Sequence, residues 1–270
     1  MATTRPVMNR RAQARPADPR ADLALPALIP CLLLSHGRPM VPGDEGPVPA
    51  RSPDGSLPDL FDVVDALHSS YPIVCVVDLD GIDRNRPQLD YLQEMARDLD
   101  IWVDAGVPTG EQAIDILVTG ARRVILGTAY LESRQELARA WKLSQDVMVD
   151  VEIRNGSVAA QDPNWSGSNP ETVALDARTV GPTEVIMSFR PGSVDWELAS
   201  RLGQSGPTWV SGTFGAEDAS HLGPSGLRGG IFHLDQGSEL WKSRTKPREG
   251  DTRSAAPRDN RSNRRRDDEA

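Results

Sequence analysis

Four acidic side chains occur at or just beyond the ends of short apolar runs, where they could transfer protons or bind a cation. These residues are Asp78, Asp80, Asp104 and Glu152. Two positioned carboxyl groups suit general acid–base catalysis, because one can donate a proton while the other accepts one. A cluster of four could instead hold Mg²⁺, which takes oxygen ligands, but their spacing shows no metal signature. We therefore favour proton transfer and expect neither a metal nor another cofactor.

Asp78 and Asp80 are two residues apart and so lie on the same face of an extended strand. Asp80 precedes Gly81 and is expected to cap a turn. Asp78 is expected to point inward, where the cost of removing a carboxylate from water calls for a partner or a catalytic role. We assign Asp78 a catalytic role, with a turn cap or an arginine partner as the alternative.

The elements that would position these residues alternate between β-branched runs and amphipathic stretches of helical period, a pattern typical of βα units with a parallel sheet. The expected strands are Leu28–Leu34, Ile73–Leu79, Asp100–Asp104, Arg123–Gly127, Val147–Ile153, Glu184–Ser188, Pro207–Ser211 and Gly230–Leu234. The expected helices are Leu57–Ser69, Pro87–Asp98, Gly110–Thr119, Glu132–Leu143, Asn169–Asp176, Val194–Leu202, Ala216–His221 and Gln236–Trp241.

Eight such units predict an α/β fold in the form of a single (β/α)8 TIM barrel, with the acidic side chains at its carboxyl face, where barrel enzymes place their chemistry. A doubly wound open sheet is the alternative, but no GxGxxG motif follows the first strand. The connection from Ser35 to Ser56 is much longer than the usual βα loop. It is either a mobile lid over the carboxyl face or a disordered insertion.

The charges divide the chain into three parts. Residues 23–241 contain 31 acidic and 15 basic residues, whereas the whole chain has a net charge of −9. Residues 1–24 and 242–270 are basic at both ends and poor in large apolar side chains, so we expect disordered tails around a barrel at 25–241. The acidic barrel would repel phosphate backbones, so nucleic acid is not an expected partner.

Cysteine and hydropathy patterns indicate a cytoplasmic protein. There are only two cysteines and no CxxC pair, so we expect no disulfide framework and two simply buried thiols. The longest apolar run, Leu23–Leu34, contains two prolines and falls short of the roughly 18 residues of a membrane span. Export through the pair Arg10-Arg11 is the weaker alternative. The oligomeric state cannot be predicted.

Three strand ends carry a resemblance to a known family: VVDLDG at 76–81, VDAGV at 103–107 and VILGTA at 124–129. These segments resemble the histidine-biosynthesis barrels, in particular ProFAR isomerase (phosphoribosylformimino-5-aminoimidazole carboxamide ribotide isomerase), whose opening Ile-Pro is matched by Ile29-Pro30. The similarity is strongest from Pro72 to Trp165. The stretch from Trp102 to Val107 is more similar to the ProFAR-isomerase-related proteins of methanogens and methylotrophs, which implies a role in one-carbon cofactor metabolism.

The resemblance implies an Amadori rearrangement of a phosphorylated aminoaldose, with aspartates at the ends of strands 1 and 5. Leu33 occupies the first of these positions, and Glu152 the second. Ser188 matches a group that assists catalysis on strand 6, and Trp165 matches a tryptophan of the strand-5 loop. The resemblance therefore implies catalytic roles for Glu152 and Ser188 and a substrate contact for Trp165.

The family binds a phosphate at each end of its substrate with glycine-rich turns. The positions that match the first phosphate site are Gly106, Gly127 and Thr128, although Asp104 adds a negative charge beside them. The positions that match the second site are Gly212 and Thr213, with His233 near an expected glycine. His233 and His36 lie nearest the mouth, and each is interpreted as a hydrogen-bonded histidine rather than a catalyst.

Together these residues predict a divergent isomerase-type barrel that binds a small phosphorylated sugar-type metabolite. The loss of an acid at Leu33 favours a changed reaction over authentic histidine biosynthesis. The alternative is a non-catalytic ligand-binding or scaffold barrel that has lost its chemistry together with that aspartate. A shared fold does not transfer the reaction by itself.

Overall fold

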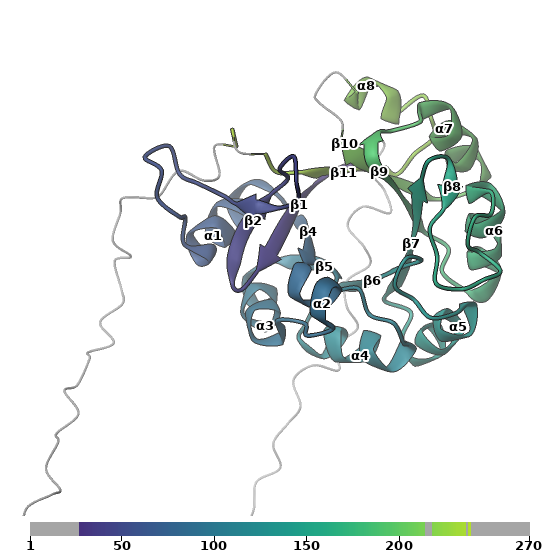
Figure 1. The fold of residues 1–270 in the computed structure, drawn as a ribbon, viewed down its shortest axis with the longest axis horizontal. Helices are drawn as coiled ribbons and strands as arrows, with labels where there is room; N and C mark the ends of the chain where they lie inside the picture. The colour runs from purple at the N-terminus through teal and green to yellow at the C-terminus, as the bar shows by residue number, and fades with distance from the viewer. Residues whose placement is uncertain (1–26, 214–217, 236, 239–270) are drawn as a thin grey trace, which may run out of the picture.

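The computed structural model describes residues 27–213, 218–235 and 237–238, and it confirms the predicted TIM barrel (Figure 1). Eight parallel strands form the wall, and pairing of the last with the first, Ala27 opposite Gly229, closes it. The wall strands are β1 (Ala27–Ser35), β4 (Ile73–Asp78), β5 (Asp100–Asp104), β6 (Arg123–Gly127), β7 (Val147–Arg154), β9 (Val185–Ser193), β10 (Thr208–Thr213) and β11 (Gly229–His233). The predicted tails at 1–24 and 242–270 lie outside the described residues.

Helices surround the strands on the outside of the barrel (Figure 1), except the short helix 79–84, whose Leu79 and Ile82 pack against apolar side chains inside the barrel at its carboxyl end. They are α1 (Leu60–Ser70), α2 (Leu79–Arg84), α3 (Leu89–Asp98), α4 (Gly110–Val118), α5 (Arg134–Leu143), α6 (Pro170–Val180), α7 (Trp196–Ser205) and α8 (Ala219–Leu222). Within the described part of the chain, no helix is long and apolar enough to cross a bilayer. The predicted helix at 236–241 falls mostly outside the described residues.

Local capping explains where several helices begin. Thr109 caps α4 by accepting a hydrogen bond from the Gln112 backbone N–H at 3.4 Å. The cap of α7 is Asp195, whose side chain accepts a hydrogen bond from the Leu198 N–H at 3.0 Å. The preceding strand β9 ends at Ser193, five residues beyond its predicted end at Ser188.

The long connection after β1 is partly sheet. β2 (Arg38–Val41) folds back antiparallel on β1, and β3 (Val48–Pro49) pairs with β2. A further short strand, β8 (Ser157–Val158), pairs antiparallel with β7. The segment after β1 is therefore an ordered extension of the barrel wall rather than an irregular loop.

Alternation along each strand separates two apolar clusters. On β1, Cys31 and Leu33 point into the barrel, whereas Leu32 and Leu34 pack outward against the helices. The outer cluster is the larger and joins the strands to the helix ring. The inner cluster fills the barrel axis below the carboxyl end, so the wall holds its polar side chains only at the two rims.

The amino-terminal rim is closed by two tryptophans and an ion pair. The rings of Trp102 and Trp209 meet edge to face, with centroids 5.0 Å apart. The Trp209 Nε1–H donates to Glu184 at 3.1 Å, and Glu184 also pairs with Arg123 at 2.7 Å. Both tryptophans belong to the apolar cluster inside the barrel rather than to the layer between the sheet and the helices.

Candidate functional site

A cavity of about 470 Å³ opens at the carboxyl end of the barrel. Its wall comes from β1, β4, β9, β10 and β11, and the turn between β2 and β3 adds Pro42, Gly43, Gly46 and Pro47. A smaller space of about 20 Å³ lies deeper between the strands and shares Val77, Arg190, Ser211 and His233 with the large cavity. The ordered extension after β1 therefore lies over the mouth where chemistry is expected.

Asp150 on β7 is the central acidic group of the deeper space. Its side chain is 4% exposed, and its Oδ2 accepts a hydrogen bond from the Ser188 hydroxyl at 2.8 Å. Burial raises the pKa of Asp150 to about 7, which the charge of Arg190 only partly offsets. Asp150 is therefore a carboxyl group that can both donate and accept a proton near neutral pH.

Asp104 on β5 is a second buried carboxyl of the same space. Burial raises its pKa to about 6, against the lowering effects of Arg190 and of the hydrogen bond from the Gly106 N–H. The charge of Asp104 further raises the pKa of Asp150, and the charge of Glu152 further raises the pKa of both. Both carboxyl groups are thus poised to carry a proton in the folded chain.

Arg190 on β9 supplies the positive charge at this end of the barrel and lines both cavities. Asp150, Asp104 and Glu152 hold its pKa above the ordinary value, so the guanidinium is permanently charged. Among the residues that the structure describes, no hydrogen bond or ion pair engages this guanidinium. Arg190 can therefore accept an anionic group that enters the large cavity.

Glu152 lies two residues beyond Asp150 on the same face of β7 and is 2% exposed. Its carboxylate pairs with the Arg154 guanidinium, with 2.6 Å from Nε to Oε1. Its backbone N–H donates to the Thr128 hydroxyl at 3.1 Å, which ties β7 to β6. The structure thus brings Glu152, Asp150 and Ser188 together at one side of the barrel.

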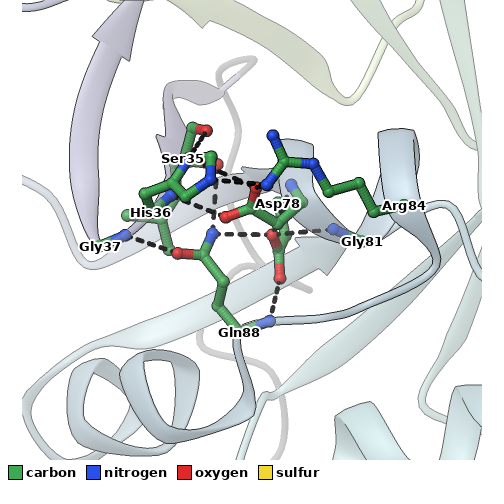
Figure 2. A network of polar contacts seen from close by, with 9 residues as sticks. Ser35, His36, Gly37, Asp78, Gly81, Arg84 and Gln88 are labelled. Atoms are coloured by element: carbon green, nitrogen blue, oxygen red, sulfur yellow. Dashed lines mark hydrogen bonds and ion pairs between the residues drawn. The ribbon is translucent and has the colours of Figure 1, made fainter.

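Asp78 has a structural position instead of the predicted catalytic one (Figure 2). It follows Val77, which faces the interior, and its side chain points to the helix layer. Its carboxylate accepts hydrogen bonds from the N–H groups of Asp80 and Gly81, and from the backbone and side chain of Gln88 at 2.6 and 2.8 Å. The expected inward direction of Asp78 is wrong, and Asp78 rather than Asp80 is the cap.

Asp80 instead joins α2 to the turn after β1. It accepts from the His36 backbone N–H at 2.7 Å and pairs with Arg84 at 3.3 Å. His36, with a φ of 50°, contacts Arg84 through its ring and is a hydrogen-bonded histidine as expected.

The four carboxylates of the sequence analysis do not converge, because Asp78 and Asp80 lie outside the wall that holds Asp104 and Glu152. In the described ranges, no group of three or more acidic, histidine or cysteine side chains is arranged to hold a metal ion.

Comparison with known proteins assigns the fold to a family. The model of the family described as "Histidine biosynthesis protein" matches residues 27–188, from β1 to β9. The chain belongs to this family. The match covers the strands that carry Asp104, Asp150, Glu152 and Ser188.

Three curated relatives show how far the similarity extends. All three are named 1-(5-phosphoribosyl)-5-((5-phosphoribosylamino)methylideneamino)imidazole-4-carboxamide isomerase. The protein of Shewanella frigidimarina is 30% identical over 125 residues, which are 42% of this chain and 51% of that protein. The protein of Thermomicrobium roseum is 33% identical over 152 residues, which are 50% of this chain and 61% of that protein. The protein of Rubrobacter xylanophilus is 40% identical over 88 residues, which are 31% of this chain and 36% of that protein. The chain thus spans between 36% and 61% of the length of these three relatives.

Within this histidine biosynthesis family fold, Leu33 takes the place where the resemblance implies an aspartate. Its side chain is 6% exposed and lines the large cavity. A leucine cannot transfer a proton, so the β1 side of the mouth is apolar. The acidic groups concentrate on β5 and β7 instead.

The groups predicted to form the first phosphate site are already hydrogen-bonded within the chain. The Gly106 N–H donates to Asp104 at 3.1 Å, and the Thr128 N–H donates to the Asp150 carbonyl at 2.8 Å. The Thr128 hydroxyl donates to the Ala159 carbonyl at 2.8 Å and is fully buried. Gly127 lies beside Thr128 and does not line either cavity.

The second predicted phosphate site faces open space. Gly212 and Thr213, at the end of β10, line the large cavity together with Arg190 and His233. Trp165, in contrast, packs in the outer cluster, and its Nε1–H donates to Asp176 of α6 at 2.9 Å. The expected contact between Trp165 and the substrate is not supported by this position.

Sequence reasoning missed Asp150 and Arg190, although both follow from alternation. Met148, Asp150 and Glu152 are spaced by two, so an inward Glu152 requires an inward Asp150. Arg190 stands two residues after Ser188, but the predicted strand stopped at Ser188. Alternation along the predicted strand Val147–Ile153 already implied an inward Asp150, and a longer prediction for β9 would have placed Arg190 in the mouth.

Proposed function

We propose that this chain is an isomerase-type enzyme that rearranges a small phosphorylated sugar-type metabolite by proton transfer, in the aldose–ketose or Amadori class. The observation that carries the proposal is Asp150, a buried carboxyl with a pKa of about 7 in a space that Arg190 also lines. A carboxyl that titrates near neutral pH can give up a proton and regain it within one reaction cycle. The isomerase names of the relatives support the reaction class.

The two acid–base roles fall to neighbouring positions of β7. Asp150, held by the Ser188 hydroxyl, is the group that protonates the ring oxygen. Glu152, paired with Arg154, is the carboxylate that removes the proton at C2. Leu33 leaves no acid on β1, so this division places both groups on one strand rather than on opposite sides of the mouth.

The anionic end of the substrate is assigned to the β9–β10 side. Arg190 provides a charged donor there, and the backbone at Gly212 and Thr213 lines the same cavity. Because the polar groups of Gly106 and Thr128 are engaged within the chain, one phosphate fits this site better than two. The proposal includes a cytoplasmic location, and the place in one-carbon cofactor metabolism remains a prediction from the resemblance alone.

The test is proton exchange at C2 in D₂O, followed by NMR with ProFAR and a panel of phosphorylated aldoses. Asp150→Asn and Glu152→Gln should each lower the exchange rate by at least roughly 100-fold while the circular dichroism spectrum stays unchanged. Asp115→Asn is the control, because Asp115 is exposed on α4 and far from the mouth. Exchange that survives both site substitutions would contradict the assigned roles.

A binding or scaffold barrel without chemistry is the second candidate, and Leu33 is the observation that favours it. In that case ligands would bind the wild type without any exchange, and Glu152→Gln would leave the affinity unchanged. Absence of exchange with every compound that binds would therefore replace the enzymatic proposal with this one.

A further inference from the structure

Two cysteines lie side by side in the barrel wall, and the proposed reaction gives them no role. Cys31 of β1 and Cys75 of β4 are register partners, and both thiols are free, buried and directed into the barrel. Neighbouring strands lie about 4.8 Å apart, and a disulfide needs Cα atoms roughly 4.4–6.8 Å apart. The spacing of the two strands therefore lies within the range that a disulfide spans.

The surroundings of the two thiols shift their pKa values in opposite directions. His233 of β11 is the register partner of Cys31 on its other side. The hydrogen bond from Cys75 and the charges of His233 and Arg190 hold the pKa of Cys31 well below its ordinary value, despite burial. The same hydrogen bond and burial raise the pKa of Cys75. Cys31 is thus the more acidic of the two thiols and the one that more readily forms the nucleophilic thiolate, whereas Cys75 is the less acidic partner.

The space around the sulfurs admits only a small reagent. Both cysteines line the deeper space of about 20 Å³, which has room for about one water-sized molecule. The neighbouring Nδ1 of His233 is buried without a hydrogen-bond partner in the described part of the chain. A sugar phosphate is too large to lie wholly within this space, whereas a small peroxide fits inside it.

We propose that Cys31 and Cys75 form an oxidisable dithiol site that reacts with hydrogen peroxide and closes a disulfide between β1 and β4. The Cys31 thiolate attacks one peroxide oxygen, and the O–O bond breaks. The released hydroxide takes a proton from the His233 imidazole and leaves as water. The sulfur of Cys75 then displaces hydroxide from the resulting sulfenic acid, and its thiol proton completes a second water. Two thiols and one peroxide thereby yield one disulfide and two waters.

The experiment treats the reduced full chain with hydrogen peroxide and then maps it without reduction. We expect the thiol titre of the denatured protein to fall from two per chain to none, because the sequence contains only two cysteines. The mass should fall by about 2 Da, and trypsin should release peptide 21–51 joined to peptide 52–84. These readouts concern the thiols only, so they are independent of the proposed isomerase activity.

Two variants test the order of the steps. Cys75→Ser should stop at a sulfenic acid on Cys31 that dimedone traps, whereas Cys31→Ser should leave Cys75 at least about tenfold slower to react. Circular dichroism checks that each variant is folded. If one variant does not fold, the peptide map of the oxidised wild type still tests whether the disulfide forms. Retention of both thiols, equal trapping in the two variants, or disulfides only between chains would overturn the proposal.

Discussion

Asp150 should make the stability of this protein depend on pH in an unusual direction. Because burial raises its pKa from 3.8 to about 7, the folded chain holds a proton between those values that the unfolded chain has lost. The free energy of unfolding therefore falls as pH rises from about 4 to about 7, and it levels off above. Asp150→Asn removes this dependence. At the upper end of this pH range, the free energy of unfolding of the variant should exceed that of the wild type by roughly 2 to 4 kcal/mol.

Urea unfolding at several pH values between 4 and 8 measures this effect. The exposed variant Asp115→Asn should follow the wild-type profile, because its carboxyl is in water in both states. Asp104 keeps a smaller dependence of the same sign in the Asp150→Asn variant, since its own pKa is about 6. Parallel profiles for wild type and Asp150→Asn would show that Asp150 is not protonated in the fold.

The residues of the mouth were only partly predictable. Glu152 and Ser188 were found through the resemblance, and both lie with Asp150 at the barrel mouth. Asp78 was misplaced because it was expected to point inward from a strand that ends at Leu79. Cys75 and Val77 face the interior, so alternation along the strand turns Asp78 toward the helices. The strand ends at Asp78, whose φ and ψ of −86° and 98° begin a helix cap.

The turn from β4 into α2 and on to α3 depends on Asp78. Asp78→Ala removes the acceptor of four hydrogen bonds, two at the start of α2 and two from Gln88. We expect the free energy of unfolding to fall by roughly 2 to 4 kcal/mol. Chemical denaturation measures this free energy. Asp83→Ala is the matched control, because Asp83 is exposed on α2, and it should change the free energy of unfolding by no more than about 0.5 kcal/mol.

A catalytic Asp78 would give a different outcome. In that case Asp78→Ala would leave unfolding nearly unchanged and abolish turnover. The structure predicts the reverse order of effects, with a loss of stability and, in the folded fraction, retained binding in the large cavity.

Strands and helices were predicted closely where the hydrophobic period was unambiguous. β5 and β6 begin and end as predicted, because each is a short buried run flanked by charged residues. The connection at Ser35–Ser56 was predicted as irregular because its prolines and glycines hide the pairing of β2 with β1. That pairing depends on a partner strand already in place, which no local pattern contains.

The assembly of the whole barrel explains why chemistry gathers on one side. β9 pairs with β7 in the parallel sheet, with Glu152 opposite Ser188, so acid, hydroxyl and arginine come from two adjacent strands. The amino-terminal rim is sealed by Trp102, Trp209 and the Arg123–Glu184 pair, which leaves the carboxyl end as the way into the barrel. The fold class followed from counting βα units, but which side chains face one another follows only from the register between the strands.

A calorimetric titration of the full chain with ProFAR tests the central claim most directly, because one trace reports both binding and turnover. We predict a binding heat followed by a slow continuing heat as substrate is converted, and only the binding heat for Asp150→Asn. Binding by the wild type without continuing heat would contradict the enzymatic account and favour the scaffold barrel. No heat at two temperatures would contradict the phosphorylated aminoaldose as the ligand of this cavity.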